Sequence, residues 1–381
     1  MAYFDNAATT FPKPNCVYDF MNEFYRVSGG SAGRGNYGVA HNSAVLISDT
    51  RTKIQNLLHC PAKQVVFTPT ATLALNIIIQ GLLKSGLRNV YISPFEHNAV
   101  TRTLHYYEKK GDIKVSKLYV DNNFAYNLER IRYQFDDNIP DLVIVSHVSN
   151  VIGLVAPIEE IFKLAKGYNA YTVADMSQST GLIDTNVGLS VFDFAVFAGH
   201  KTMYGPTGIS GFVMKPDIVL EPILFGGTGF ESANQDMPSS IPERFEMGTS
   251  NIVGIAGLNA ALQWLEKQGL DEIWKIELEH RKRLLEILQR YDFIRIIGNN
   301  SSSKFAGIVS CVIDGISSDS AAGIFNQLGI AVRTGLHCAP LAHQFLETFP
   351  AGTIRFSVGY FTTEEDFEEL ENALDEIEYS L

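Results

Sequence analysis

The sequence has few cysteines, a deficit of basic residues and no long apolar run. Four cysteines in 381 residues are too few for a disulfide framework. Only 30 Lys and Arg residues face 42 Asp and Glu residues, and the net charge of −12 argues against a nucleic-acid-binding protein. The longest apolar stretch, residues 73–83, is shorter than the ~20 residues of a membrane span, and no signal peptide is recognisable. We therefore expect a cytoplasmic protein that binds neither nucleic acid nor membrane.

What the sequence does contain is the pattern of a large α/β core. Hydrophobic residues make up 46% and charged residues 19%, which excludes intrinsic disorder and a coiled coil. Short β-branched runs alternate with helical patterns such as 158–166, and their near-continuous apolar character indicates a parallel sheet buried on both faces. The predicted strands are 64–67, 89–92, 142–146, 171–174 and 194–197.

The C-terminal third has a different pattern, typical of a smaller α+β domain. Helices are predicted over 253–269, 271–291 and 318–328, and strands over 293–297, 307–313, 330–333 and 353–358. An acidic helix closes the chain, and Thr362 with Glu365 has the spacing of a capping box. We expect a large domain over residues 13–250, and a small domain formed by residues 1–12 and 251–381.

Polar residues follow the predicted strands, where open α/β sheets bind their ligands. A helix preceded by threonines follows 64–67 and has the character of a phosphate site. Asp175 directly follows one buried strand, where a carboxylate needs a cationic partner, and Lys201 follows another, where burial favours an amine nucleophile. Singly, each is better explained as an ordinary turn or structural residue. Together they meet the requirements of pyridoxal phosphate (PLP).

A family resemblance runs over nearly the whole chain, from the segment Tyr3-Phe4-Asp5-Asn6-Ala7-Ala8-Thr9-Thr10 to Arg355. The sequence resembles the aminotransferase class V enzymes of fold type I, in particular the cysteine desulfurase and selenocysteine lyase branch. The resemblance implies a PLP cofactor, with Lys201 as the Schiff-base lysine, Asp175 facing the pyridine nitrogen and His97 stacked on the ring. The implied cofactor-binding residues are Ala71, Thr72, His97, Asn150, Asp175, Gln178, His200, Lys201 and Thr249.

The same resemblance implies a homodimer and a substrate site. Thr249 would reach the phosphate from the partner subunit, while Arg355 and Asn150 would bind the substrate, Arg355 through the α-carboxylate. Arg333 is a candidate to assist Arg355. In one departure from the family pattern, Ala198 replaces a serine that donates to the phosphate, and either Thr202 or Thr70 is a candidate to donate in its place.

Cys338 is distinguished from the other cysteines by its surroundings. It lies in a predicted loop beside His337, whereas Cys16, Cys60 and Cys311 have apolar neighbours in sequence. The surrounding stretch resembles the Arg-x-Gly-His-His-Cys-Ala signature of one desulfurase group, with Leu336 in place of the first histidine. The resemblance implies that Cys338 attacks the substrate sulfur.

The resulting hypothesis is a PLP-dependent cysteine desulfurase that converts L-cysteine to L-alanine and carries the sulfur on Cys338 as a persulfide. Lys201, Cys338 and His97 are the predicted catalytic residues, with His97 also shuttling a proton. The alternatives are a selenocysteine lyase, or another class V aminotransferase or C–S lyase in which Cys338 is incidental. The sulfur acceptor is left open among a scaffold protein, a carrier protein and a small thiol.

Two further motifs are rejected as ligand sites. Residues 33–38 match the dinucleotide pattern G-x-G-x-x-G, but no strand precedes them and no carboxylate follows ~20 residues later. We interpret this segment as a flexible loop over the active site. His337, Cys338 and His343 suggest zinc, but a structural site needs four ligands, so we expect no metal.

Overall fold

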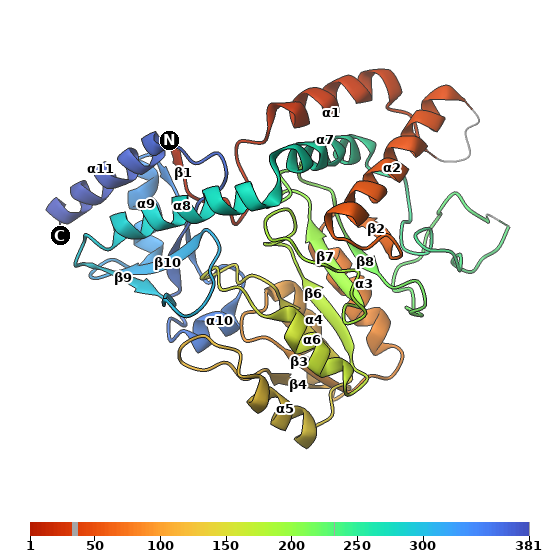
Figure 1. The fold of residues 1–381 in the computed structure, drawn as a ribbon, viewed down its shortest axis with the longest axis horizontal. Coiled ribbons are helices and arrows are strands. Elements are labelled where there is room, and N and C mark those ends of the chain that lie inside the picture. The colour runs from red at the N-terminus through yellow and green to blue at the C-terminus, as the bar shows by residue number, and fades with distance from the viewer. Residues whose placement is uncertain (33–36, 232, 381) are drawn as a thin grey trace.

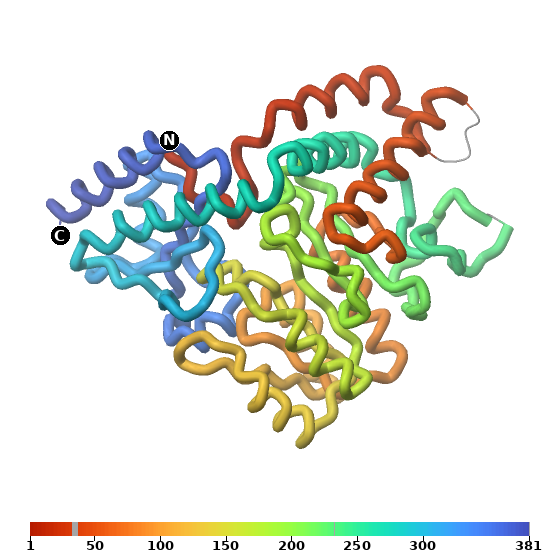
Figure 2. Tube along the Cα trace, viewed as in Figure 1, coloured from red at the N-terminus to blue at the C-terminus, as the bar shows by residue number. Residues whose placement is uncertain are grey.

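A computed structural model describes residues 1–32, 37–231 and 233–380. Most of the predicted loop at residues 33–38, namely residues 33–36, lies outside the described residues. The chain forms one large sheet and a separate smaller sheet, each covered by helices (Figures 1 and 2).

The large sheet has seven strands in the order β2-β8-β7-β6-β5-β3-β4. All pairs from β7 through β4 are parallel, and only β8 runs antiparallel, to both of its neighbours. Because β8 separates β2 from β7, β2 points the same way as the parallel strands. The strands are β2 (Gln64–Thr68), β3 (Asn89–Ile92), β4 (Lys114–Lys117), β5 (Leu142–Ser146), β6 (Tyr171–Asp175), β7 (Phe194–Ala198) and β8 (Ser210–Met214).

Helices cover both faces of this sheet, each over its own apolar core. One core contains side chains of α3 (Ala71–Leu83) and α4 (Asn98–Lys109). The other contains side chains of α5 (Leu128–Asp137), α6 (Ile158–Lys166), α2 (Gly38–Leu57) and α7 (Ile252–Gln268), with α1 (Asn15–Ser28) packed on α7. This confirms the predicted parallel sheet flanked by helices.

The smaller sheet is antiparallel and has its own core. Its order is β12-β13-β10-β9, formed by β9 (Ile294–Ile297), β10 (Ile308–Ile313), β12 (Arg333–Gly335) and β13 (Thr353–Ser357). The core includes side chains of α8 (Leu270–Leu288), α9 (Ser318–Gln327) and α11 (Glu364–Ser380), and α10 (Pro340–Phe345) follows β12. The N-terminal strand β1 (Ala2–Tyr3) pairs with β11 (Ile330–Ala331), beside α11 (Figure 1). The smaller α+β unit is as predicted; its boundary at residue 250 stays a prediction.

Some local predictions are wrong. Strands β4 and β8 were not predicted, and the single strand expected over 330–333 is two, β11 and β12. The last helix is capped one residue later than expected: Thr363 Oγ1 accepts from the Asp366 N–H at 3.3 Å, and the Asp366 carboxylate accepts from the Thr363 N–H at 2.8 Å. Asp366 is shorter than Glu365 but serves as the acidic member of this box.

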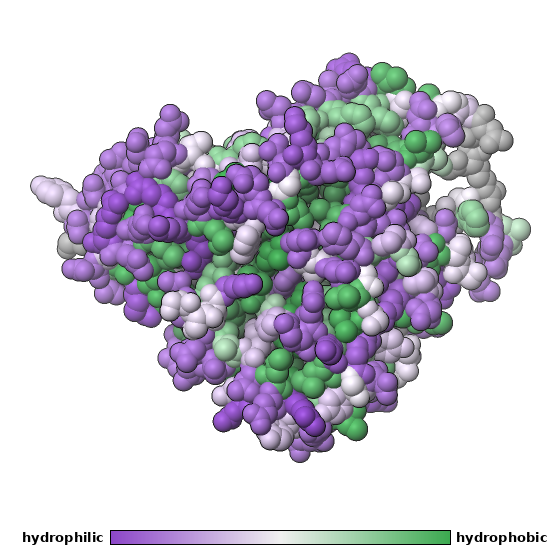
Figure 3. Space-filling model, viewed as in Figure 1, coloured by the Kyte–Doolittle hydropathy of each residue, from purple (hydrophilic) through white to green (hydrophobic). Residues whose placement is uncertain are grey.

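The surface on the viewed face is mostly hydrophilic, with small dispersed apolar patches (Figure 3). Among the helices in the described part of the chain, none combines the length and apolar character needed to cross a membrane.

Candidate active site

The parallel strands end at one edge of the large sheet, and a cavity of about 250 Å³ lies there. Eight of the predicted cofactor-binding residues line it: Ala71, Thr72, His97, Asn150, Asp175, Gln178, His200 and Lys201. They come from the ends of β2, β3, β5, β6 and β7, separated by as much as 130 positions in sequence (201 − 71). The topology therefore brings together residues that the sequence presents as separate motifs.

Lys201 lies in a tight turn directly after β7. The turn depends on Gly199, because a Cβ at this position would lie 2.4 Å from the carbonyl oxygen of Ile209. Lys201 lines the cavity, and the burial of its amine lowers its pKa to about 8. The negative charge of Asp175 acts in the opposite direction and raises this pKa. At neutral pH an appreciable fraction of this amine is unprotonated, as a nucleophile or base requires.

Asp175 ends β6 and is buried, with 7% of its surface exposed. Its Oδ1 accepts hydrogen bonds from the Ser177 backbone N–H at 3.0 Å and the Ser177 hydroxyl at 2.5 Å. These donors fix the carboxylate in the cavity, where it is available to a cationic ring nitrogen.

His97 is the N-cap of α4, and its position in the cavity follows from that role. Its Nδ1 accepts a hydrogen bond from the Ala99 N–H at 3.0 Å. Burial, followed by the positive charge of Lys201, lowers its pKa. A neutral ring that accepts at Nδ1 carries its proton on Nε2, so His97 presents one N–H donor.

The start of α3 forms the other end of the cavity. Thr70 is the N-cap of this helix, its Oγ1 accepting from the Leu73 N–H, and Ala71 and Thr72 occupy the first turn. His200 also lines the cavity, and its buried Nδ1 has no hydrogen-bond partner among the described residues. A helix N-terminus with an unsatisfied imidazole nitrogen nearby suits an anion such as a phosphate.

The structure distinguishes the two threonines that could donate to a phosphate where Ala198 cannot. The Thr202 hydroxyl donates to the Thr180 carbonyl oxygen at 2.7 Å and is engaged there. Thr70 lines the cavity together with Ala198. The geometry therefore favours Thr70 over Thr202.

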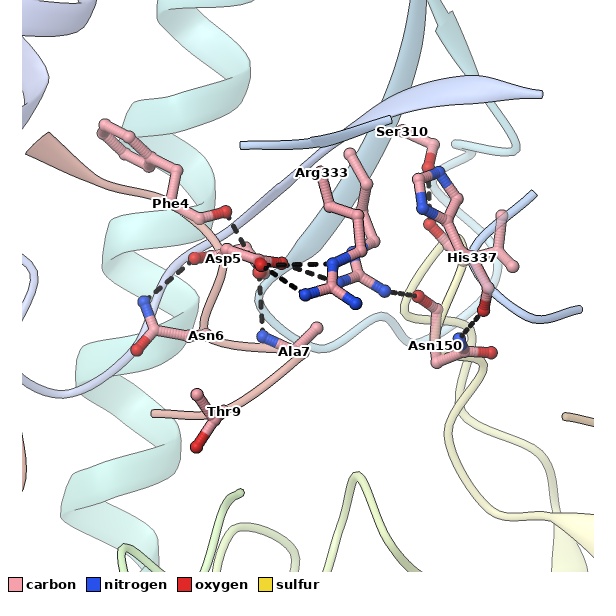
Figure 4. Close-up of polar contacts among 12 residues, drawn as sticks. Phe4, Asp5, Asn6, Ala7, Thr9, Asn150, Ser310, Arg333 and His337 are labelled. Carbon is pink, nitrogen blue, oxygen red and sulfur yellow. Dashed lines mark hydrogen bonds and ion pairs between the residues drawn. The ribbon is translucent and has the colours of Figure 1, made fainter. Parts of the chain in front are cut away.

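Arg355 lies on β13, in contact with Asn150, and is 2% exposed. Its Nη1 donates to the Asn150 carbonyl oxygen at 2.9 Å, and its Nη2 donates to Asp5 at 2.8 Å (Figure 4). Arg333 donates to the same Asp5 carboxylate. The burial of Arg355 excludes the simpler explanation that it forms a surface ion pair. Asp5 had no role in the sequence interpretation, although it stands in the N-terminal motif.

Cys338 lies in the loop after β12, and two backbone carbonyls of this loop contact the start of α4 and the segment after β5. The Cys338 carbonyl accepts from the Asn98 N–H at 2.7 Å, and the His337 carbonyl accepts from Asn150 Nδ2 at 2.7 Å. Cys338 is exposed and lines a second cavity that shares His97 and Thr72 with the first. Cys338 thus belongs to the same site as Lys201.

Two observations concern what distinguishes Cys338 from the other cysteines. Exposure does not single out Cys338, because Cys16 on α1 is exposed too, although its Sγ lies 3.9 Å from the Ala260 carbonyl oxygen of α7. His337 does not provide a positive charge to the thiol. Its buried ring bonds the Thr353 hydroxyl at 2.9 Å, and burial, followed by the charge of Arg355, lowers its pKa well below the ordinary value.

Thr249 is not among the residues that line the cavity, and it is exposed in the segment before α7.

Glu96 is a buried neighbour of the cavity residue Ser146, and the sequence predicted no role for it. Its carboxyl group accepts from the Ser146 N–H and hydroxyl, and burial, followed by the charge of Asp175, raises its pKa to about 8. The carboxyl is therefore largely protonated at neutral pH. The only signal in the sequence was its position next to His97.

Comparisons with known proteins agree with this geometry. The family model Aminotransferase class-V matches residues 2–370. Proteins of Pyrococcus abyssi and Aeropyrum pernix, both named probable cysteine desulfurase, are 31% and 32% identical over 100% and 99% of this chain and 94% of their own. The solved apo structure of a cysteine desulfurase from Thermococcus onnurineus is 29% identical, with a TM-score of 0.92 over 100% of this chain and 95% of that one. The chain belongs to the aminotransferase class-V family, as its sequence motifs predicted, and has the fold-type-I architecture.

Proposed function

We propose that this protein is a PLP-dependent cysteine desulfurase, which converts L-cysteine to L-alanine and transfers the sulfur to Cys338. One observation carries the proposal: the cavity lined by Lys201 and Asp175 adjoins a second cavity lined by the exposed Cys338, and His97 belongs to both. The names of the relatives support the same activity.

The residues present fit the proposed cofactor. The unpartnered Nδ1 of His200 and the N-terminus of α3 would hold the phosphate, Asp175 the ring nitrogen, and Gln178 and Asn150 the ring hydroxyl. Lys201 would hold the cofactor covalently. When bound, PLP supplies an electron sink that stabilises negative charge at the substrate Cα.

The protein's own residues perform the remaining tasks. Arg355 binds the substrate α-carboxylate. The Lys201 amine, with its lowered pKa, removes the Cα proton. His97 would pack on the cofactor ring and present its Nε2–H for proton transfer.

Sulfur transfer requires Cys338 as a thiolate. A bond forms between the Cys338 Sγ and the substrate sulfur while the substrate Cβ–S bond breaks, and the electron pair of that bond stays with the substrate carbon. A proton delivered to that carbon, together with the return of a proton from Lys201 to Cα, completes L-alanine, and Cys338 is left as a persulfide. The exposed position of Cys338 leaves the transferred sulfur accessible to a sulfur acceptor.

We also propose a homodimer in which Thr249 reaches the partner's phosphate site. Thr249 is exposed. Large apolar side chains are exposed on α1, on α2 and in the segment before α7, including those of Tyr25, Val27, Val45, Phe225 and Phe230. These parts lie at the same end of the molecule, at the right of the view in Figure 1. A second copy covering them would bury this apolar surface.

Replacement of Cys338 tests the function. We expect Cys338→Ala to lower alanine formation from L-cysteine at least about a hundredfold while cofactor absorbance is kept. Cys16→Ala, at the other exposed cysteine, is the matched control and should be fully active. Retained desulfuration in Cys338→Ala would point to a C–S lyase. If Cys338→Ala loses alanine formation from L-cysteine but keeps it from L-selenocysteine, the Cys338 thiol is needed for sulfur release only.

A further inference from the structure

The carboxylate of Asp5 accepts hydrogen bonds from two arginines of the smaller sheet, Arg333, which Figure 4 labels, and Arg355. Its Oδ1 accepts from Arg355 Nη2 at 2.8 Å, and its Oδ2 accepts from Arg333 Nε and Nη2 at 3.1 and 3.0 Å. The exposed fractions of the side chains are 2% for Arg355, 14% for Asp5 and 49% for Arg333. The contact with Arg355 is therefore well shielded from solvent, where a charge-assisted hydrogen bond is strong.

The fold makes an anion necessary at this point. Arg333 and Arg355 are directly opposite each other on β12 and β13. Like charges opposite each other on neighbouring strands repel, and the repulsion is larger when one of them is buried. Asp5 reaches them because it forms a parallel bridge with Ser357, and the Ala7 N–H donates to the Ser357 hydroxyl at 2.9 Å.

Asp5 also determines which donors of Arg355 stay free. The guanidinium is held at both ends, Nη1 by the Asn150 carbonyl and Nη2 by Asp5. Its buried Nε has no hydrogen-bond partner in the described part of the chain. The two arginines and one aspartate leave a net charge of +1, which matches a ligand with a single carboxylate.

We propose that Asp5 is a positioning residue for substrate-carboxylate recognition. It fixes the Arg355 guanidinium against Asn150 and keeps the charge of Arg333 from displacing it. The inference rests on the proposed function in one respect, namely that Arg355 binds the α-carboxylate.

The N-terminal segment has other contacts with the site, so the test needs a control for its docking. The Ala7 carbonyl accepts from Gln178 Nε2 at 2.8 Å, and the Thr10 N–H donates to the His200 carbonyl at 3.2 Å. Ser357→Ala removes the hydroxyl that holds this segment and leaves the charges around Arg355 unchanged. It separates loss of docking from loss of the Asp5 charge.

The experiment measures the binding of L-alanine and of ethylamine, which lacks the carboxylate, to the PLP-loaded protein through changes in cofactor absorbance. Asp5→Asn should weaken L-alanine binding roughly tenfold or more and leave ethylamine binding unchanged. With L-cysteine, KM should rise by a similar factor with kcat almost unchanged. Asp5→Glu should restore part of the affinity, and Ser357→Ala should leave the ratio of the two affinities at the wild-type value.

Three results would overturn the proposal: unchanged L-alanine affinity in Asp5→Asn, tighter binding, or an equal loss for L-alanine and ethylamine. Wild-type protein that binds both ligands equally would overturn it too. None of these binding measurements involves sulfur. A wild-type protein that binds L-alanine as expected but releases no sulfur from L-cysteine would therefore contradict the proposed function and leave the role of Asp5 supported.

Discussion

Lys201 follows a strand of the large sheet and Cys338 follows a strand of the smaller sheet. The surroundings of the two residues differ in burial and backbone geometry. Lys201 follows a fully buried strand, in a turn packed against Ile209. Cys338 is exposed. The backbone φ angle is positive at Cys338 (56°) and at His337 (47°), a conformation that residues other than glycine rarely adopt. Hydrogen bonds from Asn98 and Asn150 hold this strained backbone in place.

The difference matches the two tasks that the proposed mechanism assigns to these residues. A cofactor must stay in one orientation through the whole reaction, and the ends of a buried sheet provide a rigid frame for it. A sulfur carrier must contact the substrate and then a second molecule, which an exposed loop allows. Substitutions on the buried side, around Lys201, and on the exposed side, around Cys338, should therefore impair the enzyme in different ways.

The largest effect is expected on the buried side. Lys201→Ala should lower alanine formation on the order of 10³-fold or more, because in the proposed mechanism one amine both holds the cofactor and moves the Cα proton. Cofactor absorbance should also be lost or shifted, unlike in Cys338→Ala. Lys84→Ala, remote from the cavity at the end of α3, is the control. The same activity loss and the same cofactor absorbance in Lys201→Ala and Cys338→Ala would contradict the distinction between the two residues.

A smaller effect concerns the pH dependence of cofactor loading. Burial lowers the pKa of Lys201 to about 8, and only the unprotonated amine attacks an aldehyde. The rate of PLP incorporation into cofactor-free protein should therefore rise about tenfold per pH unit below 8 and level off above it. Asp175→Asn should move the midpoint to lower pH, because the charge of Asp175 raises this pKa. A midpoint near that of a free lysine would contradict the burial argument.

The smallest effect is expected across the proposed dimer interface. Thr249→Ala should weaken PLP binding roughly two- to tenfold, the loss of one hydrogen bond, with the mass of the dimer in solution unchanged. The adjacent Ser250→Ala is the control, since Ser250 is exposed as well. A monomer in solution, or identical PLP affinities of the two variants, would contradict a contribution of Thr249 from the partner.

The buried side was also the easier one to predict. Each of its predicted strands is a largely apolar run, and β3, β5 and α6 have the predicted bounds. Strand β4 was missed because only two of its four residues are even half-buried, and β8 because it follows a turn-rich stretch and begins Ser210-Gly211. The order of the strands is absent from any local pattern, since it depends on contacts between distant segments.

The surroundings of Cys338 and Arg355 depend on such distant contacts throughout. Asp5 contacts Arg355, 350 positions away, and no spacing in the sequence indicates this pair. Cys16 has apolar neighbours in sequence, but one of them, Tyr18, is itself 46% exposed. The role of Cys338 therefore came from its likeness to a signature, and the structure adds its place beside His97 and Lys201.

The most direct test of the central claim is mass spectrometry of the PLP-loaded protein after exposure to L-cysteine without reductant. The account predicts one added sulfur atom on the peptide that contains Cys338, none on the peptide that contains Cys16, and removal of that sulfur by a thiol reductant. Alanine and sulfide formed at the wild-type rate, with Cys338 unmodified throughout, would contradict it.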